Sequence, residues 1–203
     1  MVISTDLRGS SPSTRRSRST DNCPEELADV PVIDDLRSYA GSIAPPGTWA
    51  EFGVAGGGTA KHFLKFMGNG TFHLFDSFKG LPEEWDFNGD INHVGRYAQP
   101  FVPKFDDPRV VIHEGMFADT LPKANLPVLD FVHIDCDIYS STKTVFEHIR
   151  VRAGTVILFD EYWGYADYMN HERKAYLEWS ERTGQELEWL GKQRSQALGR
   201  IKC

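Results

Sequence analysis

The stretch WAEFGVAGGGTAKHF, residues 49–63, joins an apolar run to four glycines within six positions. A strand followed by a glycine-rich turn and a helical pattern is typical of the first unit of a nucleotide-binding α/β sheet. The dinucleotide spacing G-x-G-x-x-G is not met, because Ala55 stands at the second glycine position. An acid, Glu51, precedes the first glycine by two residues. The stretch therefore predicts a ligand-binding strand-turn-helix unit and leaves the ligand open.

On both sides of this stretch, apolar runs alternate with amphipathic patterns. Such alternation predicts βαβ units and a parallel sheet covered by helices on both faces. We expect helices over 32–43, from Thr59 to near Gly68, over 140–151 and over 170–184, with Thr59, Ser140 and Ser141 as candidate N-caps. We expect parallel strands over 48–54, 71–76, 109–113, 129–135 and 155–160, and two antiparallel strands over 186–191 and 197–202.

The chain of 203 residues is long enough for one domain with a real core. Its first 20 residues hold nine Ser or Thr and four Arg against one Asp. Such a segment buries too little apolar surface to offset its ordering entropy. We therefore expect residues 1–24 to be a disordered tail, or a lid that orders over an anionic ligand. Residues 25–203 are expected to form a single domain.

The composition excludes several classes of protein. A net charge of −7 and a pI near 5.5 disfavour a nucleic-acid-binding surface. The three cysteines have no spacing typical of a zinc site or a disulfide framework. The sequence contains neither an apolar run of the ~20 residues that a membrane helix needs nor the apolar core of a secretory signal. A cytoplasmic protein without a membrane partner is the expectation.

Acidic side chains stand at the ends of four predicted strands. These acids are Glu51, Asp76, the pair Asp135 and Asp137, and the pair Asp160 and Glu161. Right-handed crossovers bring the carboxyl ends of parallel strands to one edge, where open sheets bind ligands. The sequence therefore predicts that these carboxylates converge on one rim.

The glycine turn and Asp76 together favour a nucleoside cofactor. Gly53 and Gly57 allow a tight turn and close approach of the backbone to a ligand. Asp76 follows Gly53 by 23 residues, near the offset of about 20 at which an acid binds ribose hydroxyls. Glu51 would repel the pyrophosphate of NAD but is compatible with the sulfonium of S-adenosylmethionine. The residues favour the latter without excluding tight strand-to-helix packing as the reason for the glycines.

The acids after the fourth and fifth strands favour a metal ion. Clustered carboxylates repel one another unless a proton or a cation neutralises them. Oxygen ligands suit Mg²⁺ or Mn²⁺. Such an ion could hold two neighbouring substrate hydroxyls and lower the pKa of one of them. Capping of the following helices is the alternative, and for Asp137 it is equally compatible with the sequence.

Five ordered motifs resemble those of the TylF-type, or macrocin O-methyltransferase, family of class I S-adenosylmethionine-dependent enzymes. They are EFGVAGGGT (51–59), FDSFKGLPE (75–83), EGMFADTLP (114–122), FVHIDCDIYSSTK (131–143) and GTVILFDEYWG (154–164). The resemblance implies a Rossmann-like class I methyltransferase fold, with a mostly parallel seven-stranded sheet, helices on both faces and a C-terminal antiparallel hairpin. It also implies an O-methyltransferase that uses Mg²⁺ to bind a vicinal diol, typically on a sugar of a natural product.

The family's roles can be carried over by position. The resemblance implies that S-adenosylmethionine is bound by Glu51, Gly53, Gly57 and Thr59 at its methionine end, by Asp76 and Ser77 at the ribose, by Gly115, Met116 and Phe117 at the adenine, and is bordered by Asp135. Core packing is an alternative role for Phe117. The implied metal ligands are Asp135, Asp160 and Glu161, although the family more often has Asp at the last position.

The acceptor side is less defined. The polar and aromatic stretch 83–105 is long enough for an acceptor lid, with His93, Arg96 and Tyr97 as its most reactive side chains. His133 lies on the same strand face as Asp135 and is a candidate catalytic residue or a buried structural one. Asp137, Tyr139 and His171 are further candidate bases. The aromatic run 161–170 suggests an interface or a substrate wall.

The leading hypothesis is therefore an O-methyltransferase whose catalytic centre includes Asp135 and Asp160. The partner is a small hydroxylated molecule, with sugars, catechols and other polyols open, and a homodimer is compatible with the sequence. A nicotinamide-dependent oxidoreductase is disfavoured by Ala55 and Glu51. A non-catalytic S-adenosylmethionine-binding regulatory protein is disfavoured because a pure binder does not need clustered carboxylates.

Overall fold

The computed structural model describes residues 23–203. The prediction of a tail or lid over 1–24 thus falls almost entirely outside the described residues. Cys23 packs against the core and Pro24 is buried, so the folded unit includes two residues assigned to the tail. A short 3-10 helix, Glu25–Leu27, follows and buries Leu27.

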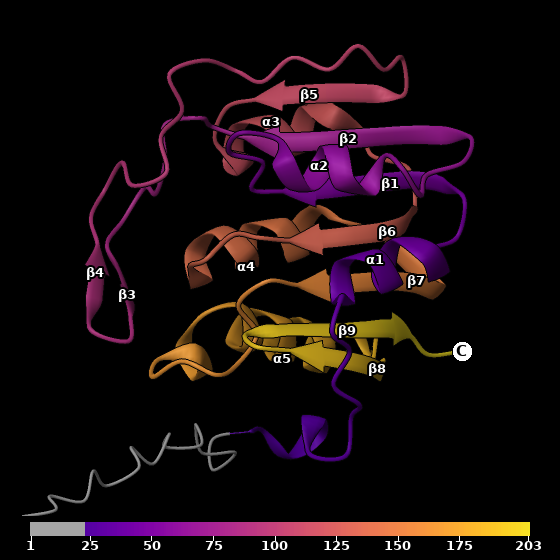
Figure 1. Cartoon of the computed structure of the whole chain (residues 1–203), viewed down its shortest axis with the longest axis vertical. Helices are drawn as coiled ribbons and strands as arrows, with labels where there is room; N and C mark the ends of the chain where they lie inside the picture. Colours follow the sequence, from indigo (N-terminus) through magenta and orange to yellow (C-terminus); the bar gives the residue numbers. More distant parts are fainter. Residues whose placement is uncertain (1–22) are drawn as a thin grey trace, which may run out of the picture.

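One seven-stranded sheet organises the domain, in the order β5-β2-β1-β6-β7-β9-β8 (Figure 1). The strands are β1 (Gly47–Phe52), β2 (Gly70–Asp76), β5 (Val110–Glu114), β6 (Leu129–Ile134), β7 (Val151–Phe159), β8 (Leu187–Gln193) and β9 (Gln196–Ile201). The first five pair in parallel, whereas β9 runs antiparallel to both β7 and β8. The predicted parallel sheet and its C-terminal antiparallel hairpin are confirmed.

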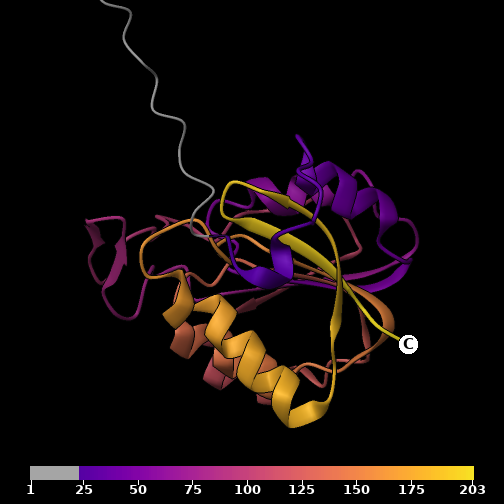
Figure 2. The ribbon, with the colours of Figure 1, turned by 90° about the horizontal axis from the view of Figure 1, so that it is seen from below.

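Helices cover both faces of the sheet (Figure 2). On one face lie α1 (Leu36–Ile43) and α2 (Gly58–Phe63), and on the other lie α3 (Phe117–Ala124), α4 (Tyr139–His148) and α5 (Glu172–Thr183). The strands carry the core: all six residues of β6 are buried. This two-sided burial is the reason that the strands read as nearly continuous apolar runs.

Several local predictions were wrong. The helix after the glycine turn begins at Gly58 with Gly57 at its N-cap, so Thr59 lies inside α2 and does not cap it. Neither serine caps α4, because the N-cap is Ile138 without a side-chain hydrogen bond, and Ser140 and Ser141 lie in the first turn. Asp137 has a positive φ of 60° just before this N-cap and does not cap the helix either.

The stretch 83–105, named here the acceptor stretch, contains a hairpin that the sequence did not predict. Its strands are β3 (Trp85–Phe87) and β4 (Asp90–Asn92). It lies beyond the carboxyl ends of the parallel strands (Figure 1). Its two-residue turn, Asn88-Gly89, has positive φ at both positions, as a type I′ turn requires. That dipeptide is the sequence signal that could have revealed the hairpin.

The run 161–170 is not the exposed aromatic surface that we expected. Its three tyrosines, Tyr162, Tyr165 and Tyr168, are all buried. Tyr162 belongs to the main core, and the other two form a small separate cluster with Trp85. Among the described residues, none of the helices has the length and hydropathy needed to traverse a bilayer.

Candidate active site

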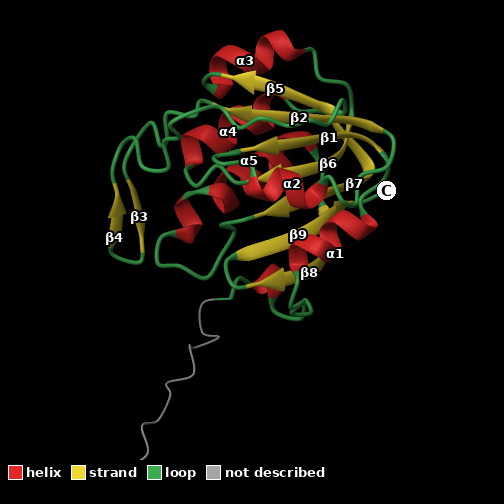
Figure 3. Cartoon of the chain, turned by 45° about the horizontal axis from the view of Figure 1, so that its top comes forward, coloured by secondary structure: helices red, strands yellow, loops and turns green. Residues whose placement is uncertain are grey.

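The strand order reverses between β1 and β6, since the chain proceeds from β1 outward to β5 and later from β6 outward to β7. Ligands of open α/β sheets bind at the carboxyl edge beside such a switch point. Figure 3 shows this edge with the β3–β4 hairpin facing it. A cavity of about 410 Å³ lies there. Its wall includes the glycine turn after β1, the loops after β2, β5, β6 and β7, and the hairpin.

Two residues of the glycine turn, Gly53 and Gly57, have no space for a side chain. Gly53 has φ of 93°, and a Cβ there would overlap the carbonyl oxygen of Asp135. Gly57 has φ of 76°, and a Cβ there would come within 2.8 Å of the Phe105 ring. Only glycine combines this conformation with this proximity. The turn is thus wedged between the loop after β6 and the end of the acceptor stretch.

Asp76 orders the glycine turn. One carboxylate oxygen accepts from the N–H groups of Val54 at 2.8 Å and Ala55 at 2.7 Å. The other accepts from the N–H of Phe78 at 2.7 Å. Asp76 also lines the cavity. A carboxylate oxygen accepts up to two hydrogen bonds, so the second oxygen retains capacity for a ligand hydroxyl.

The loop after β5 forms the opposite wall. Gly115, Met116 and Phe117 all line the cavity, together with Ser77 after β2. The Phe117 ring meets the Phe52 ring edge to face at a centroid distance of 5.9 Å, and Met116 is 40% exposed. Phe117 therefore packs on the core and also borders the cavity.

Other predicted residues lie beneath or beside the cavity. Glu51 is completely buried and faces His133 on the neighbouring strand, so it does not reach the cavity wall. Gly57, Thr59, His133 and Asp160 are also absent from that wall. Seven of the residues predicted to bind the cofactor do line the cavity: Gly53, Asp76, Ser77, Gly115, Met116, Phe117 and Asp135.

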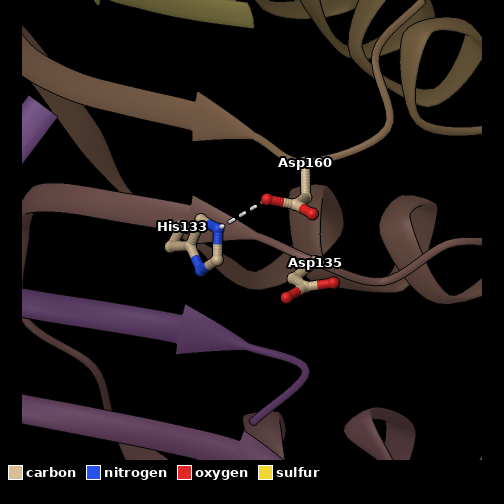
Figure 4. A group of neighbouring side chains, drawn as sticks. All are labelled: His133, Asp135 and Asp160. Atoms are coloured by element: carbon tan, nitrogen blue, oxygen red, sulfur yellow. Dashed lines mark ion pairs between the residues drawn. The ribbon is translucent and has the colours of Figure 1, made fainter. Parts of the chain in front are cut away.

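The acids after β6 and β7 converge as predicted. Their ligand atoms form two groups in which all atoms lie within 4.8 Å of one another: His133, Asp135 and Asp160 in one, and Asp135, Asp137 and Glu161 in the other. Figure 4 shows the first group, with Asp135 and Asp160 following adjacent strands. Asp135 is common to both groups. Asp135, Asp137 and Glu161 line the cavity directly.

His133 is buried between two carboxylates. Its Nδ1 lies 3.7 Å from Glu51. Its Nε2 lies 3.7 Å from Asp160, as Figure 4 shows. Burial lowers the pKa of His133, but the two carboxylates outweigh it and raise the pKa to about 10. The imidazolium therefore balances charge beneath the acids. It has no surface on the cavity from which to reach a substrate.

Asp160 has a second cation beside it. An Arg37 guanidinium N–H from α1 donates to Asp160 Oδ1 at 2.6 Å, and the Gln196 amide donates to the same oxygen. Burial raises the pKa of Asp160, but His133 and Arg37 outweigh it and hold the pKa below its usual range. Asp160 is thus ionised at neutral pH.

The pKa values of the three acids on the cavity wall are shifted in the opposite direction, upward. Burial, followed by the charge of Asp160, raises the pKa of Asp135 well above its ordinary value and that of Asp137 to about 7. The same two causes raise the pKa of Glu161 well above its ordinary value. The Oε2 atom of Glu161 is buried and has no hydrogen-bond partner among residues 23–203. These groups favour a cation or protons between them.

Sequence reasoning missed Glu172 at the start of α5. This side chain is completely buried, and its two oxygens accept from the N–H groups of Cys136 at 3.0 Å and Glu161 at 3.1 Å. Burial raises its pKa to about 8. Its partners are 36 and 11 residues away, and no local pattern signals such contacts.

The acceptor side of the cavity is aromatic and polar. Trp85, Phe87 and Asn92 of the hairpin line it, followed by Arg96 and Tyr97. The predicted lid residue His93 points elsewhere, because its Nδ1 pairs with Glu84 at 2.8 Å and both side chains are exposed. Phe87 stacks on Tyr165 at 4.9 Å between ring centroids, which joins the hairpin to the segment after β7.

Of the four candidate bases, Asp137 alone lines the cavity. The Tyr139 hydroxyl donates to Glu178 at 2.7 Å in an exposed contact. His171 Nε2 lies 3.1 Å from Asp167. His133 is sealed beneath the acids, as described above. The geometry therefore separates Asp137 from the other three.

Comparison with known proteins places this architecture among methyltransferases. The family model described as macrocin-O-methyltransferase (TylF) matches residues 34–178. A search of curated proteins found no match. The solved structure of the O-methyltransferase NovP is 20% identical, with a TM-score of 0.63 over 84% of this chain and 79% of that one. That of CalS11, a TDP-rhamnose 3'-O-methyltransferase of calicheamicin biosynthesis, is 22% identical, with a TM-score of 0.55 over 82% and 76%. At these identities the two structures support the fold alone.

Proposed function

Because the chain belongs to the macrocin-O-methyltransferase (TylF) family and is therefore an S-adenosylmethionine-dependent O-methyltransferase, we propose that it methylates one hydroxyl of a vicinal diol on a small molecule, with a divalent cation bound at the acidic loops. The observation that carries the proposal is the meeting of the glycine turn with Asp135, Asp137 and Glu161 at one cavity. The acceptor that CalS11's name gives, TDP-rhamnose, is a sugar. A sugar diol of natural-product type is accordingly the first class to test.

We infer the cofactor's place from the residues that line the cavity. Asp76 would receive the ribose hydroxyls with its second oxygen, beside Ser77. Met116 and Phe117 offer the apolar surface that an adenine ring needs, and Gly53 leaves space near Asp135 for the methionine end. Glu51 would act through His133 beneath this site, since neither side chain reaches the wall.

The donor set fits Mg²⁺ or Mn²⁺. These ions take carboxylate oxygens and complete their shells with water and substrate. We assign the ion to Asp135, which both groups share, with Asp160 from the first group and Glu161 from the second. Asp160 is held ionised, and Glu161 has a buried oxygen without a partner in the described chain. When bound there, such a cation would supply orientation of two neighbouring hydroxyls and a lower pKa for the one to be methylated.

The protein's own groups then align and deprotonate the acceptor. S-adenosylmethionine, held by the residues named above, would supply the methyl carbon to the acceptor oxygen, and its sulfur would keep the electron pair of the broken carbon–sulfur bond. Asp137, on the cavity wall, is placed to receive the hydroxyl proton. The hairpin residues Trp85 and Phe87 would hold the rest of the acceptor and exclude water. Alignment of this kind contributes a large part of such rate enhancements.

Mn²⁺ binding and turnover of matched variants test these roles. The wild type, Asp137→Asn, Asp160→Asn and the exposed control Asp106→Asn would be titrated with MnCl₂ and followed by electron paramagnetic resonance. Methyl transfer to a panel of sugar diols and catechols would be measured with and without EDTA.

We expect Asp160→Asn to lose Mn²⁺ binding, and Asp137→Asn to retain it while losing turnover. Loss of Mn²⁺ binding in Asp137→Asn would instead identify Asp137 as a ligand, as the second acidic group allows. Full activity in EDTA would contradict the role of the cation. The Asp106 control should behave as wild type.

A further inference from the structure

Two acidic loops follow adjacent strands: the loop after β6 carries Asp135 and Asp137, and the loop after β7 carries Asp160 and Glu161. Each loop begins directly where its strand ends. The Asp135 N–H donates to Phe52 of β1 and the Asp160 N–H donates to Ile134 of β6, each at 2.9 Å. These are the last ladder hydrogen bonds that hold the two strands before the loops begin. The next N–H group of each loop, at Cys136 and Glu161, therefore needs a partner from outside the ladder.

Glu172 supplies both partners. Its Oε1 accepts from Cys136 N at 3.0 Å and its Oε2 accepts from Glu161 N at 3.1 Å. The side chain thus joins the two loops. Because the side chain is 0% exposed, water is not available to replace these bonds.

We propose that Glu172 is a positioning residue that fixes the spacing between the loop of Asp135 and Asp137 and the loop of Asp160 and Glu161. It does not face the cavity and does not touch a substrate. Capping of its own helix is a weaker explanation, because both of its oxygens bind N–H groups outside α5. The effect on the cation rests on the proposed function, whereas the effect on the loops does not.

The position of Glu172 in α5 suits the task. It is the first residue of the helix, next to the two loops that it contacts. The rest of α5 packs along α4, so the helix gives the carboxylate a rigid base. A glutamine of the same size would leave one loop N–H facing an amide N–H₂, and an aspartate would be one methylene too short to reach both loops.

Tyr176 offers a matched control on the same helix. Its hydroxyl oxygen accepts from the N–H of Leu187 at 3.1 Å, a buried hydrogen bond far along the chain from the acidic loops. Glu172→Gln and Tyr176→Phe each remove one buried acceptor of a backbone N–H from α5. A loss of general stability would therefore appear in both variants, and a loss of loop positioning in only one.

The first readout is the rate of amide hydrogen exchange, which NMR measures residue by residue in samples without cofactor or metal. We expect exchange at Cys136, Glu161 or both to become about 10-fold faster or more in Glu172→Gln, as expected when a buried N–H group is left without its acceptor. Tyr176→Phe should leave both amides unchanged and accelerate exchange at Leu187. Unchanged protection of Cys136 and Glu161 in folded Glu172→Gln would overturn the proposal. If that variant does not fold, Glu172→Asp is read in the same way.

The second readout is the affinity for MnCl₂ and for S-adenosylhomocysteine in the same samples. Removing a group that orients metal ligands weakens metal binding about 10- to 100-fold, so we expect such a loss for Mn²⁺ in Glu172→Gln. The affinity for S-adenosylhomocysteine should be retained. A wild type that binds neither ligand would contradict the proposed function and leave the exchange result to decide the role of Glu172. Equal weakening of Mn²⁺ binding in Tyr176→Phe would overturn the positioning role.

Discussion

The Cα of Gly53 lies against the carbonyl oxygen of Asp135, with no space between them for a Cβ. The first residue follows the strand β1 and opens the glycine turn, and the second opens the loop after β6. The same turn is fixed from its other side by Asp76. The part of the cavity assigned to the cofactor and the part assigned to the cation therefore share one close contact. A substitution that disrupts this contact is expected to weaken the binding of both ligands.

Gly53→Ala tests this contact. The new methyl group would collide with Asp135 and would also strain a φ of 93°, so we expect a loss of about 2–4 kcal/mol in the free energy of unfolding. Binding of S-adenosylhomocysteine should be lost as well. Gly58→Ala is the control, because a Cβ at Gly58 meets nothing within 4 Å. Thermal unfolding and calorimetry measure both effects, and a stable Gly53→Ala protein with normal binding would contradict this interpretation.

Asp76→Asn should weaken cofactor binding through the glycine turn. An amide nitrogen cannot accept the N–H groups of Val54, Ala55 or Phe78, so part of this network must break. Loss of hydrogen bonds to a charged acceptor predicts a decrease of about 10-fold or more in the affinity for S-adenosylhomocysteine. Isothermal titration calorimetry measures it, with the exposed Asp106→Asn as reference. Equal affinities in the two variants would remove Asp76 from the site.

Arg37→Met should make the stability of the protein depend on Mg²⁺. Without the guanidinium, Asp160 loses a cation that is 2.6 Å away, although solvent already screens an arginine side chain that is 39% exposed. We expect a loss of about 1–2 kcal/mol in the free energy of unfolding, largely restored by MgCl₂.

Arg152→Met is the matched control for that experiment. Arg152 pairs with Asp130 at 2.5 Å near the start of β6, away from the acidic loops. Thermal unfolding with and without MgCl₂ compares the two variants. A similar response of both variants to Mg²⁺ would show that Arg37 does not balance the charge of a cation site.

The pair His73 and His113 predicts a pH dependence of stability. Their rings hydrogen bond at 2.9 Å between β2 and β5, so one imidazole donates and the other accepts. Burial, followed by His113, lowers the pKa of His73 from 6.5 to about 4. Because the folded value is below the unfolded value, the unfolded chain binds more protons in this range. This contribution is complete above pH 6.5 and is lost as the pH falls toward 4.

His73→Asn measures that contribution. The amide can replace Nδ1 in the hydrogen bond to His113 and does not titrate. We expect the melting temperature of the wild type to fall more steeply than that of the variant between pH 6.5 and about 4. Parallel curves would mean that His73 has no perturbed pKa.

The sheet could be predicted because its signals are local. Each parallel strand is a buried apolar run, and the helices between them repeat their apolar residues at helical spacing. The same locality explains why Asp76, Asp135, Asp160 and Glu161 could be placed on one rim. The helix α3 was missed because it is short and contains Pro122. The hairpin was missed because each of its strands has only three residues.

The contacts that support the acidic loops from beneath the cavity could not be predicted from local patterns. Arg37 pairs with Asp160 across 123 positions of the chain, and Glu172 binds Cys136 across 36. Neither contact has a periodic or motif signal, since each depends on how a helix docks on the finished sheet. The same is true of Glu51, which the sequence assigned to the ligand and the structure buries against His133.

Calorimetric titration of the purified wild-type chain with S-adenosylhomocysteine, without added metal, is the most direct test of the central claim that the cavity at the β1–β6 switch point binds this cofactor. We predict one site per chain with micromolar affinity. No detectable heat of binding, in protein shown to be folded by circular dichroism, would contradict the claim and would leave the acidic loops in need of another function.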